Sequence, residues 1–238
     1  MKRFLTSWVI LALASMLIAC SPKNEKTSIK QLSTQADKIG YALGLDMGKR
    51  LNTIKDEINI EAFNQGVLDS FKGKTPLLSE EQIREIKTAF SKKMIAEREA
   101  NKKELAEKNK TEGEKFLAEN AKKEGVRATQ SGLQYLVISE GSGNKPTLAD
   151  RVTVNYKGTL LDGTEFDSSY KRGKPASFSL RGVIKGWTEG LQLMSVGSKY
   201  RFFIPPELAY GEVGAGKAIG PNQTLIFDVE LISIEKSK

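Results

Sequence analysis

The residues that could do chemistry in this chain are mostly aromatic, and they cluster in four segments of its C-terminal half. The segments read VTVNYKGTLLDGTEFDSS (152–169), GVIKGWTEGLQLMSVG (182–197), FFIPPELAYG (202–211) and GPNQTLIFDVEL (220–231). Strand-like alternation surrounds the aromatic positions, and their spacing predicts that the rings converge on one pocket. Each ring taken alone is more often a core residue, so the prediction depends on the segments occurring together.

The chain contains no histidine and only one cysteine, which removes many kinds of catalytic site. A Ser-His-Asp triad, a Cys-His pair and a His-ligated zinc site are all impossible within one chain. No intrachain disulfide can form either. We therefore expect neither a metal nor another cofactor.

The formal net charge of +8 is compatible with binding to nucleic acid or to an anionic membrane. Most lysines, however, alternate with glutamates, as in KKELAEKNKTEGEK (102–115). Such alternation is typical of a solvated helix, and no aromatic-rich basic groove accompanies it. We therefore expect no nucleic-acid partner.

From Gly132 onward, apolar residues alternate with the period of two that is typical of β-strands. A short segment interrupts this pattern, because its apolar residues recur every three or four positions, as in a helix: Val183, Trp187, Leu191 and Met194. Several antiparallel strands and one short helix predict an α+β fold, in which a half-barrel sheet wraps on the helix.

These segments resemble the FKBP-type peptidyl-prolyl cis-trans isomerases, and the resemblance is collinear from about Gln130 to Glu235. The FD, GVIKGW and AYG motifs occur in the order and spacing of that family. In the family, the matched positions line a shallow apolar cleft that receives a proline ring. These positions are Tyr156, Phe166, Asp167, Arg172, Phe178, Val183, Ile184, Trp187, Tyr210, Ile219 and Phe227.

The resemblance further implies a catalytic role for Asp167, Ile184 and Tyr210. The backbone N–H of Ile184 would donate to one substrate carbonyl, and the Tyr210 hydroxyl to the carbonyl of the residue before proline. Asp167 has a second interpretation, which we favour: with Arg172 it forms a polar network that orients Tyr156. The implied substrate-binding residues are Trp187 as the floor, Tyr156, Phe166 and Phe227 as walls, and Arg172, Phe178, Val183 and Ile219.

The implied reaction suits a chain without an acid–base histidine. Rotation about an X-Pro bond breaks no covalent bond, and its barrier of about 18–20 kcal/mol comes from amide resonance. An apolar pocket disfavours the charge-separated resonance form and can bind the twisted amide better than the planar one. Proline-containing polypeptides are the expected clients. Ala176, Ala215 and Ala218 stand where some relatives carry larger residues, which leaves the affinity for macrolide inhibitors open.

The N-terminus is typical of a bacterial lipoprotein signal. A lysine–arginine pair precedes an apolar run at 4–18, which is shorter than the roughly 20 residues of a membrane span. The only cysteine, Cys20, ends the sequence LIAC, which resembles a lipobox. We expect a signal peptide over 1–19, lipidation of Cys20, a tether over 20–31, and an outer-membrane location facing the periplasm or the outside. The alternative is an ordinary secretory signal with a chance cysteine.

Residues 32–78 predict helices that pack closely against another helix. Gly40, Gly44 and Gly48 recur on one face, although each mid-helix glycine costs roughly 1 kcal/mol relative to alanine. A close contact explains this spacing, either in a homodimer or within the monomer. The layout resembles the macrophage-infectivity-potentiator-type FKBPs, which implies a homodimer.

Residues 79–125 predict one long connecting helix that opens with a capping-box pattern, SEEQ. The apolar stripe thins beyond Ala100, so we expect the second half of this helix to stand in solvent, with Gly113 as a weak point. The isomerase domain would then occupy residues 126–238.

Two classes of function follow from these patterns. The leading hypothesis is an enzyme, a lipid-anchored dimeric prolyl isomerase that assists the folding of envelope or secreted proteins. The alternative is a chaperone-like lipoprotein whose cleft and helices hold unfolded clients with little turnover. A purely structural lipoprotein explains the anchor but not the clustered pocket motifs.

Overall fold

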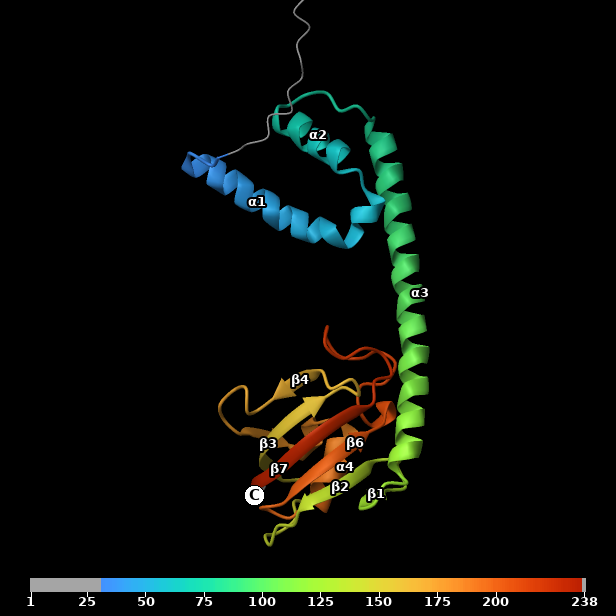
Figure 1. Ribbon diagram of the computed structural model, residues 1–238, viewed down its shortest axis with the longest axis vertical. Coiled ribbons are helices and arrows are strands. Elements are labelled where there is room, and N and C mark those ends of the chain that lie inside the picture. Colours follow the sequence, from blue (N-terminus) through green and yellow to red (C-terminus); the bar gives the residue numbers. More distant parts are fainter. Residues whose placement is uncertain (1–30, 237–238) are drawn as a thin grey trace, which may run out of the picture. The chain divides into compact units, whose positions relative to one another are not determined.

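The computed structural model describes residues 31–236, which form two compact units with the boundary between Leu78 and Ser79 (Figure 1). The predicted signal peptide, Cys20 and most of the predicted tether lie outside the described residues. No helix within 31–236 is both long and apolar enough to cross a membrane.

Helices are the regular elements in the described part of the first unit, and side chains cap both of its α-helices. Thr34 and Asp37 form a capping box at the first α-helix. Asn59 accepts a hydrogen bond from the Ala62 N–H at the second, over 2.8 Å. These caps satisfy N–H groups that have no partner inside a helix. The elements are α1 (Gln35–Leu51), the 3-10 segment η1 (Asn52–Glu57) and α2 (Ile60–Phe71).

This first unit has no buried residue in α1, η1 or α2. A Cβ added to Gly40, Gly44 or Gly48 would meet no atom of the described chain within 4 Å, so the glycine face contacts nothing there. Large exposed apolar surfaces of this kind are typical of interaction sites. The exposed apolar side chains of these helices are Ile39, Tyr41, Leu43, Leu45, Met47, Ile60, Val67, Leu68 and Phe71.

The second unit begins with the long helix α3 (Glu80–Asn120). Its 41 residues extend over about 60 Å at 1.5 Å per residue. Ser79 and Gln82 cap its first turn reciprocally, as the SEEQ pattern predicts. The helix runs through Gly113 as a single element.

The second half of α3 is packed against the rest of this unit, so the prediction that it stands in solvent is wrong. Asn109, Gly113 and Asn120 are buried, and the ring of Phe116 lies 5.8 Å from that of Phe203. The buried residues of this contact are two amides and a glycine. Because such residues give no periodic hydrophobic stripe, the apolar pattern did not show the buried face.

The sheet of this unit has seven antiparallel strands in the order β1-β2-β6-β7-β3-β4, with β5 paired to β3. Its centre is β3 paired along its whole length with β7, where Tyr156 faces Val229 and Gly158 faces Phe227. The strands are β1 (Val126–Ala128), β2 (Gln134–Ser139), β3 (Arg151–Thr159), β4 (Glu165–Ser168), β5 (Ala176–Ser179), β6 (Lys199–Ile204) and β7 (Leu225–Glu235).

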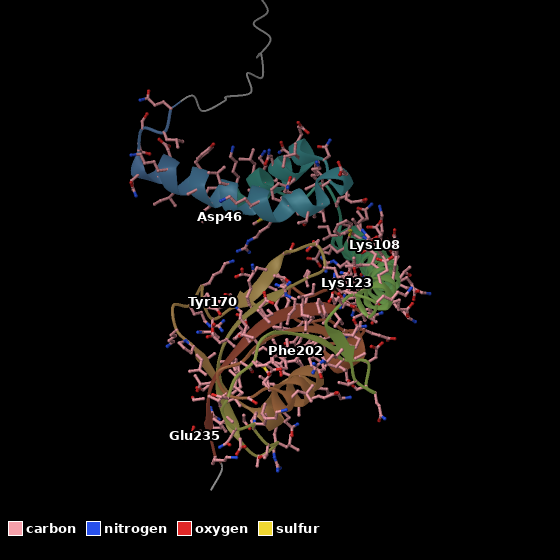
Figure 2. All side chains as sticks on the ribbon, turned by 60° about the horizontal axis from the view of Figure 1, so that its bottom comes forward. Asp46, Lys108, Lys123, Tyr170, Phe202 and Glu235 are labelled. Carbon is pink, nitrogen blue, oxygen red and sulfur yellow. The ribbon has the colours of Figure 1, made fainter. Side chains whose placement is uncertain are left out.

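One short helix, α4 (Lys185–Leu193), packs on the sheet after the 3-10 turn η2 (Leu180–Gly182). A Cβ on Gly190 would lie 2.7 Å from the ring of Phe202, and one on Gly186 would lie 2.5 Å from Ile204. The two glycines therefore let α4 approach the sheet closely. Phe202, labelled in Figure 2, is completely buried in the resulting core. The predicted α+β fold, with helices before an antiparallel sheet that packs on a short helix, is confirmed.

Candidate functional site

A cleft of about 720 Å³ opens beside α4, and residues of β3, β4, β5, β7 and the segment between β6 and β7 line it. Ten of the eleven sequence-predicted site residues line it. The exception is Arg172, which bonds two of the lining residues from outside the cleft. The lining residues are Tyr156, Phe166, Asp167, Phe178, Gly182, Val183, Ile184, Trp187, Tyr210, Ala215, Gly216, Ala218, Ile219 and Phe227.

Trp187 is the centre of an aromatic cluster at this cleft, and only 4% of it is exposed. Tyr156, Phe178 and Phe227 surround it with ring centroids 5.1, 5.4 and 5.2 Å away and planes nearly perpendicular to its own. Edge-to-face packing of this kind is the favoured geometry of aromatic pairs. The indole is therefore fixed in one orientation, with an apolar surface available to a ligand.

Close approach of the rings depends on a glycine in β3. A Cβ on Gly158 would lie 2.7 Å from atoms of both Phe166 and Phe227, whose rings pack edge to face with centroids 5.4 Å apart. Any larger residue there would push the two rings apart. The positions of these two wall rings thus depend on the pairing of β3 with both β4 and β7.

Besides the buried indole Nε1–H of Trp187, two hydrogen-bond donors of the cleft have no partner inside the described chain. Ile184 precedes α4, and its carbonyl accepts from the N–H groups of Trp187 and Thr188, whereas its own N–H has no acceptor within residues 31–236. The Tyr210 hydroxyl likewise has no partner in that range, and 40% of Tyr210 is exposed. Both donors are free to bind a ligand carbonyl.

A polar network borders the cleft at Tyr156, Asp167 and Arg172. The Tyr156 hydroxyl donates to Asp167 over 2.5 Å, and the Arg172 guanidinium donates both to that hydroxyl, over 2.6 Å, and to Asp167. The guanidinium also lies 5.3 Å from the centroid of the Tyr156 ring. Asp167 and Arg172 thus both contact the Tyr156 hydroxyl directly.

The ionisation of this network is fixed by its surroundings. Burial, together with the hydrogen bond to Asp167, raises the pKa of Tyr156. Burial by itself would raise the pKa of Asp167, but hydrogen bonds from Tyr156 and Arg172 outweigh it, and the pKa of Asp167 is lowered. At neutral pH the network therefore holds a neutral phenol, a carboxylate and a guanidinium.

The loop that follows Tyr210 supplies lining residues that the motif comparison did not select. In the sequence Ala215 and Ala218 stand out only as departures from the family pattern, and Gly182 and Gly216 match none of the predicted site positions. Their positions beside matched residues are the only signal that could have revealed them. Among residues 31–236, no group of three or more His, Cys, Asp or Glu residues could hold a metal ion.

Comparison with known proteins agrees with this geometry. A family model described as FKBP-type peptidyl-prolyl cis-trans isomerase matches residues 142–232. A second model, described as the domain amino terminal to FKBP-type peptidyl-prolyl isomerase, matches residues 36–137. Together the two models cover most of the residues that the structure describes.

Individual relatives are similar over nearly the whole chain. The outer membrane protein MIP of Legionella longbeachae is 43% identical over 228 residues, which cover 96% of this chain and 98% of the relative. FkpA of Aeromonas hydrophila, an FKBP-type peptidyl-prolyl cis-trans isomerase, is 44% identical over 261 residues, covering 99% and 96%. The crystal structure of FkpA from Escherichia coli aligns with a TM-score of 0.69 and 40% identity, covering 87% of this chain and all of that one.

The chain therefore belongs to the family of FKBP-type peptidyl-prolyl cis-trans isomerases. It is an enzyme of that type, with the N-terminal region that the second family model describes.

The ionisation of the polar network predicts a flat pH profile of activity. We expect kcat/KM on a prolyl peptide to vary less than about two-fold between about pH 6 and 9. The lowered pKa of Asp167 and the raised pKa of Tyr156 lie outside this range, and the chain has no histidine. A stopped-flow or protease-coupled assay measures this, and a bell-shaped profile centred near neutrality would contradict it.

The lowered pKa of Asp167 also determines how acid changes the stability of the folded protein. Because the pKa of Asp167 is lower when folded, its stabilising contribution is present above its ordinary value of 3.8 and is lost as the pH falls through the folded pKa. We therefore expect the difference in Tm between the wild type and Asp167→Asn to be smaller at about pH 3 than at pH 7.

Proposed function

We propose that this isomerase rotates X-Pro bonds in envelope or secreted polypeptides, with the proline ring bound against Trp187. The observation that carries the proposal is the enclosure of Trp187 by three perpendicular rings beside two free donors, the Ile184 N–H and the Tyr210 hydroxyl. An apolar ring fits the first feature, and the carbonyls that flank it fit the second. Proline in a peptide combines both.

The mechanism we propose needs no proton transfer. Moving the amide from water to the apolar cleft disfavours its charge-separated resonance form, which lowers the double-bond character of the C–N bond. Donors at Ile184 and Tyr210 hold the chain on both sides of the rotating bond. The cleft then accelerates rotation to the extent that it binds the twisted amide more tightly than the planar one.

Asp167 and Arg172 act, in this proposal, by holding the wall of the cleft. Their bonds fix the Tyr156 hydroxyl, and so the edge that the Tyr156 ring presents to Trp187. Phe166, another wall residue, packs in turn against the ring of Phe227.

The Tyr210 hydroxyl provides the most specific test of the assigned roles. We expect Tyr210→Phe to lower kcat/KM on a prolyl peptide by about two- to ten-fold, since one neutral hydrogen bond is lost while binding and desolvation remain. Tyr170→Phe is the matched control, because the Tyr170 hydroxyl makes only a 3.5 Å contact with Glu230 away from the cleft residues. Equal rates for Tyr210→Phe and the wild type would exclude the role of this hydroxyl.

We propose that the first unit forms a homodimer through the glycine face of α1. The support is physical: α1, η1 and α2 bury nothing by themselves, and the space in front of Gly40, Gly44 and Gly48 is open. Burying apolar surface contributes about 25 cal/mol per Å², so a second copy of the same unit would offer the missing core. Such a contact is self-complementary, as expected for a two-fold dimer.

Gly44→Leu tests the dimer directly. The substituted side chain meets open space in the described chain, so it should disturb only the contact with a second copy. We expect it to weaken the dimer by about ten- to a hundred-fold in Kd, measured by sedimentation velocity at micromolar concentration. Ala118→Leu, which adds the same side chain at an exposed position of α3, should leave the dimer unchanged. A wild-type chain that sediments as a monomer would overturn the proposal.

We propose further that Cys20 is lipidated and anchors the protein to the bacterial outer membrane. The support is the LIAC sequence at the end of a short apolar run and the outer-membrane description of the Legionella longbeachae relative. Mass spectrometry of the mature N-terminus should find an acylated Cys20 as the first residue. An unmodified cysteine within a longer chain would contradict the lipoprotein assignment.

A further inference from the structure

The loop between β6 and β7 (205–224, the β6–β7 loop) lies along the second half of α3 (Figure 1). The side-chain amide of Asn109 donates to the Pro221 carbonyl over 2.7 Å. A second, longer contact of 3.4 Å joins the Asn222 amide to the Ala106 carbonyl. Each side of the interface thus supplies an amide donor to the backbone of the other.

The contact between helix and loop is tightly packed and buried. Asn109 is only 6% exposed and Thr224 is completely buried. A Cβ on Gly113 would lie 2.4 Å from the Thr224 hydroxyl oxygen, and one on Gly220 would lie 3.4 Å from the Asn109 amide nitrogen. The loop has little room to move toward α3 at this point.

The other side of the same loop forms one wall of the cleft, where Tyr210 and Ile219 line it. Backbone bonds connect this wall to the segment held by α3. Asn222 donates its N–H to the Gly211 carbonyl over 2.8 Å, and Ala215 and Ile219 exchange two bonds of 2.8 and 3.1 Å. Asn222 has a φ of 52°, the only positive φ among the non-glycine residues described, which marks the sharp turn that allows this connection.

We propose that Asn109 of α3 is a positioning residue of the isomerase, which holds the Tyr210 and Ile219 wall of the cleft through the Pro221 carbonyl. The inference rests on the proposed role of that wall in binding the substrate. It assigns to the long helix a part in the reaction, although no residue of α3 lines the cleft.

Attachment of α3 to this unit does not depend on Asn109 alone. Near the end of the helix, Asn120 donates to Gln134 over 2.9 Å, and Gln134 donates back to the Leu117 carbonyl over 2.9 Å. Phe116 packs on Phe203 in the same region. The separate anchor at Asn120 touches β2 rather than the β6–β7 loop, so the two roles can be distinguished experimentally.

The test compares the same isosteric change at three asparagines of α3 in the full chain. Asn109→Asp places a carboxylate oxygen against the Pro221 carbonyl, and we expect kcat/KM on a prolyl peptide to fall about three- to ten-fold well below the unfolding temperature. Asn120→Asp should lower Tm and leave kcat/KM unchanged. Asn101→Asp, at an exposed position, should change neither.

A second variant keeps the proposal testable where Asn109→Asp does not fold. Asn222→Gly retains the left-handed backbone and removes the contact with Ala106, so kcat/KM should fall in the same direction but less. Combined with Asn109→Asp, its effect should be less than additive, because the two contacts join the same segment of the β6–β7 loop to α3.

Each outcome separates this inference from the proposed function. An active wild type with unchanged kcat/KM in Asn109→Asp, or an equal fall in Asn109→Asp and Asn120→Asp, would overturn the positioning role alone. A Tyr210→Phe variant with the kcat/KM of the wild type would instead contradict the proposed role of this wall in binding the substrate.

Discussion

The close packing of α4 on the sheet is the constraint on which the rest of the isomerase unit depends. Glycine at 186 and 190 lets the helix approach β6, and glycine at 158 lets two wall rings meet; a Cβ at any of the three would lie within 2.7 Å of a neighbouring side chain. With that spacing, Trp187 is held by three perpendicular rings and keeps one orientation. A rigid floor matters because a pocket that need not reorganise spends less of its binding free energy on ordering itself.

The cleft combines this rigid apolar floor with a polar border whose charges are already neutralised. Asp167 is paired with Arg172, so no unpaired carboxylate faces the apolar surface. Isomerisation requires an environment that disfavours charge separation in the amide, and an unpaired charge would work against it. In the proposed mechanism the ion pair acts by position, through the hydrogen bonds of Asp167 and Arg172 to the Tyr156 hydroxyl.

Much of the isomerase unit could be predicted from the sequence, because period-two alternation and the aromatic motifs report strands and their buried faces directly. Ten of the eleven motif residues line the cleft, and Arg172 donates a hydrogen bond to the lining residue Tyr156. The docking of α3 could not be predicted, since Asn109, Gly113 and Asn120 carry no hydrophobic signal, and the partners of Asn109 and Gly113 lie more than 100 residues away in the sequence. Glycines 40, 44 and 48 predicted a close contact, but within residues 31–236 no atom lies within 4 Å of a Cβ built on any of them, so the partner of this face is left to the proposed dimer.

The central claim is that a proline ring binds on Trp187 while the neighbouring donors hold the chain. A crystal structure of the full chain with a proline-containing peptide tests it most directly. The account predicts the ring over the indole face of Trp187, with the Ile184 N–H and the Tyr210 hydroxyl each within about 3 Å of a peptide carbonyl oxygen. A peptide bound on the exposed helices α1 and α2, with an empty cleft, would contradict the account and favour the chaperone-like alternative.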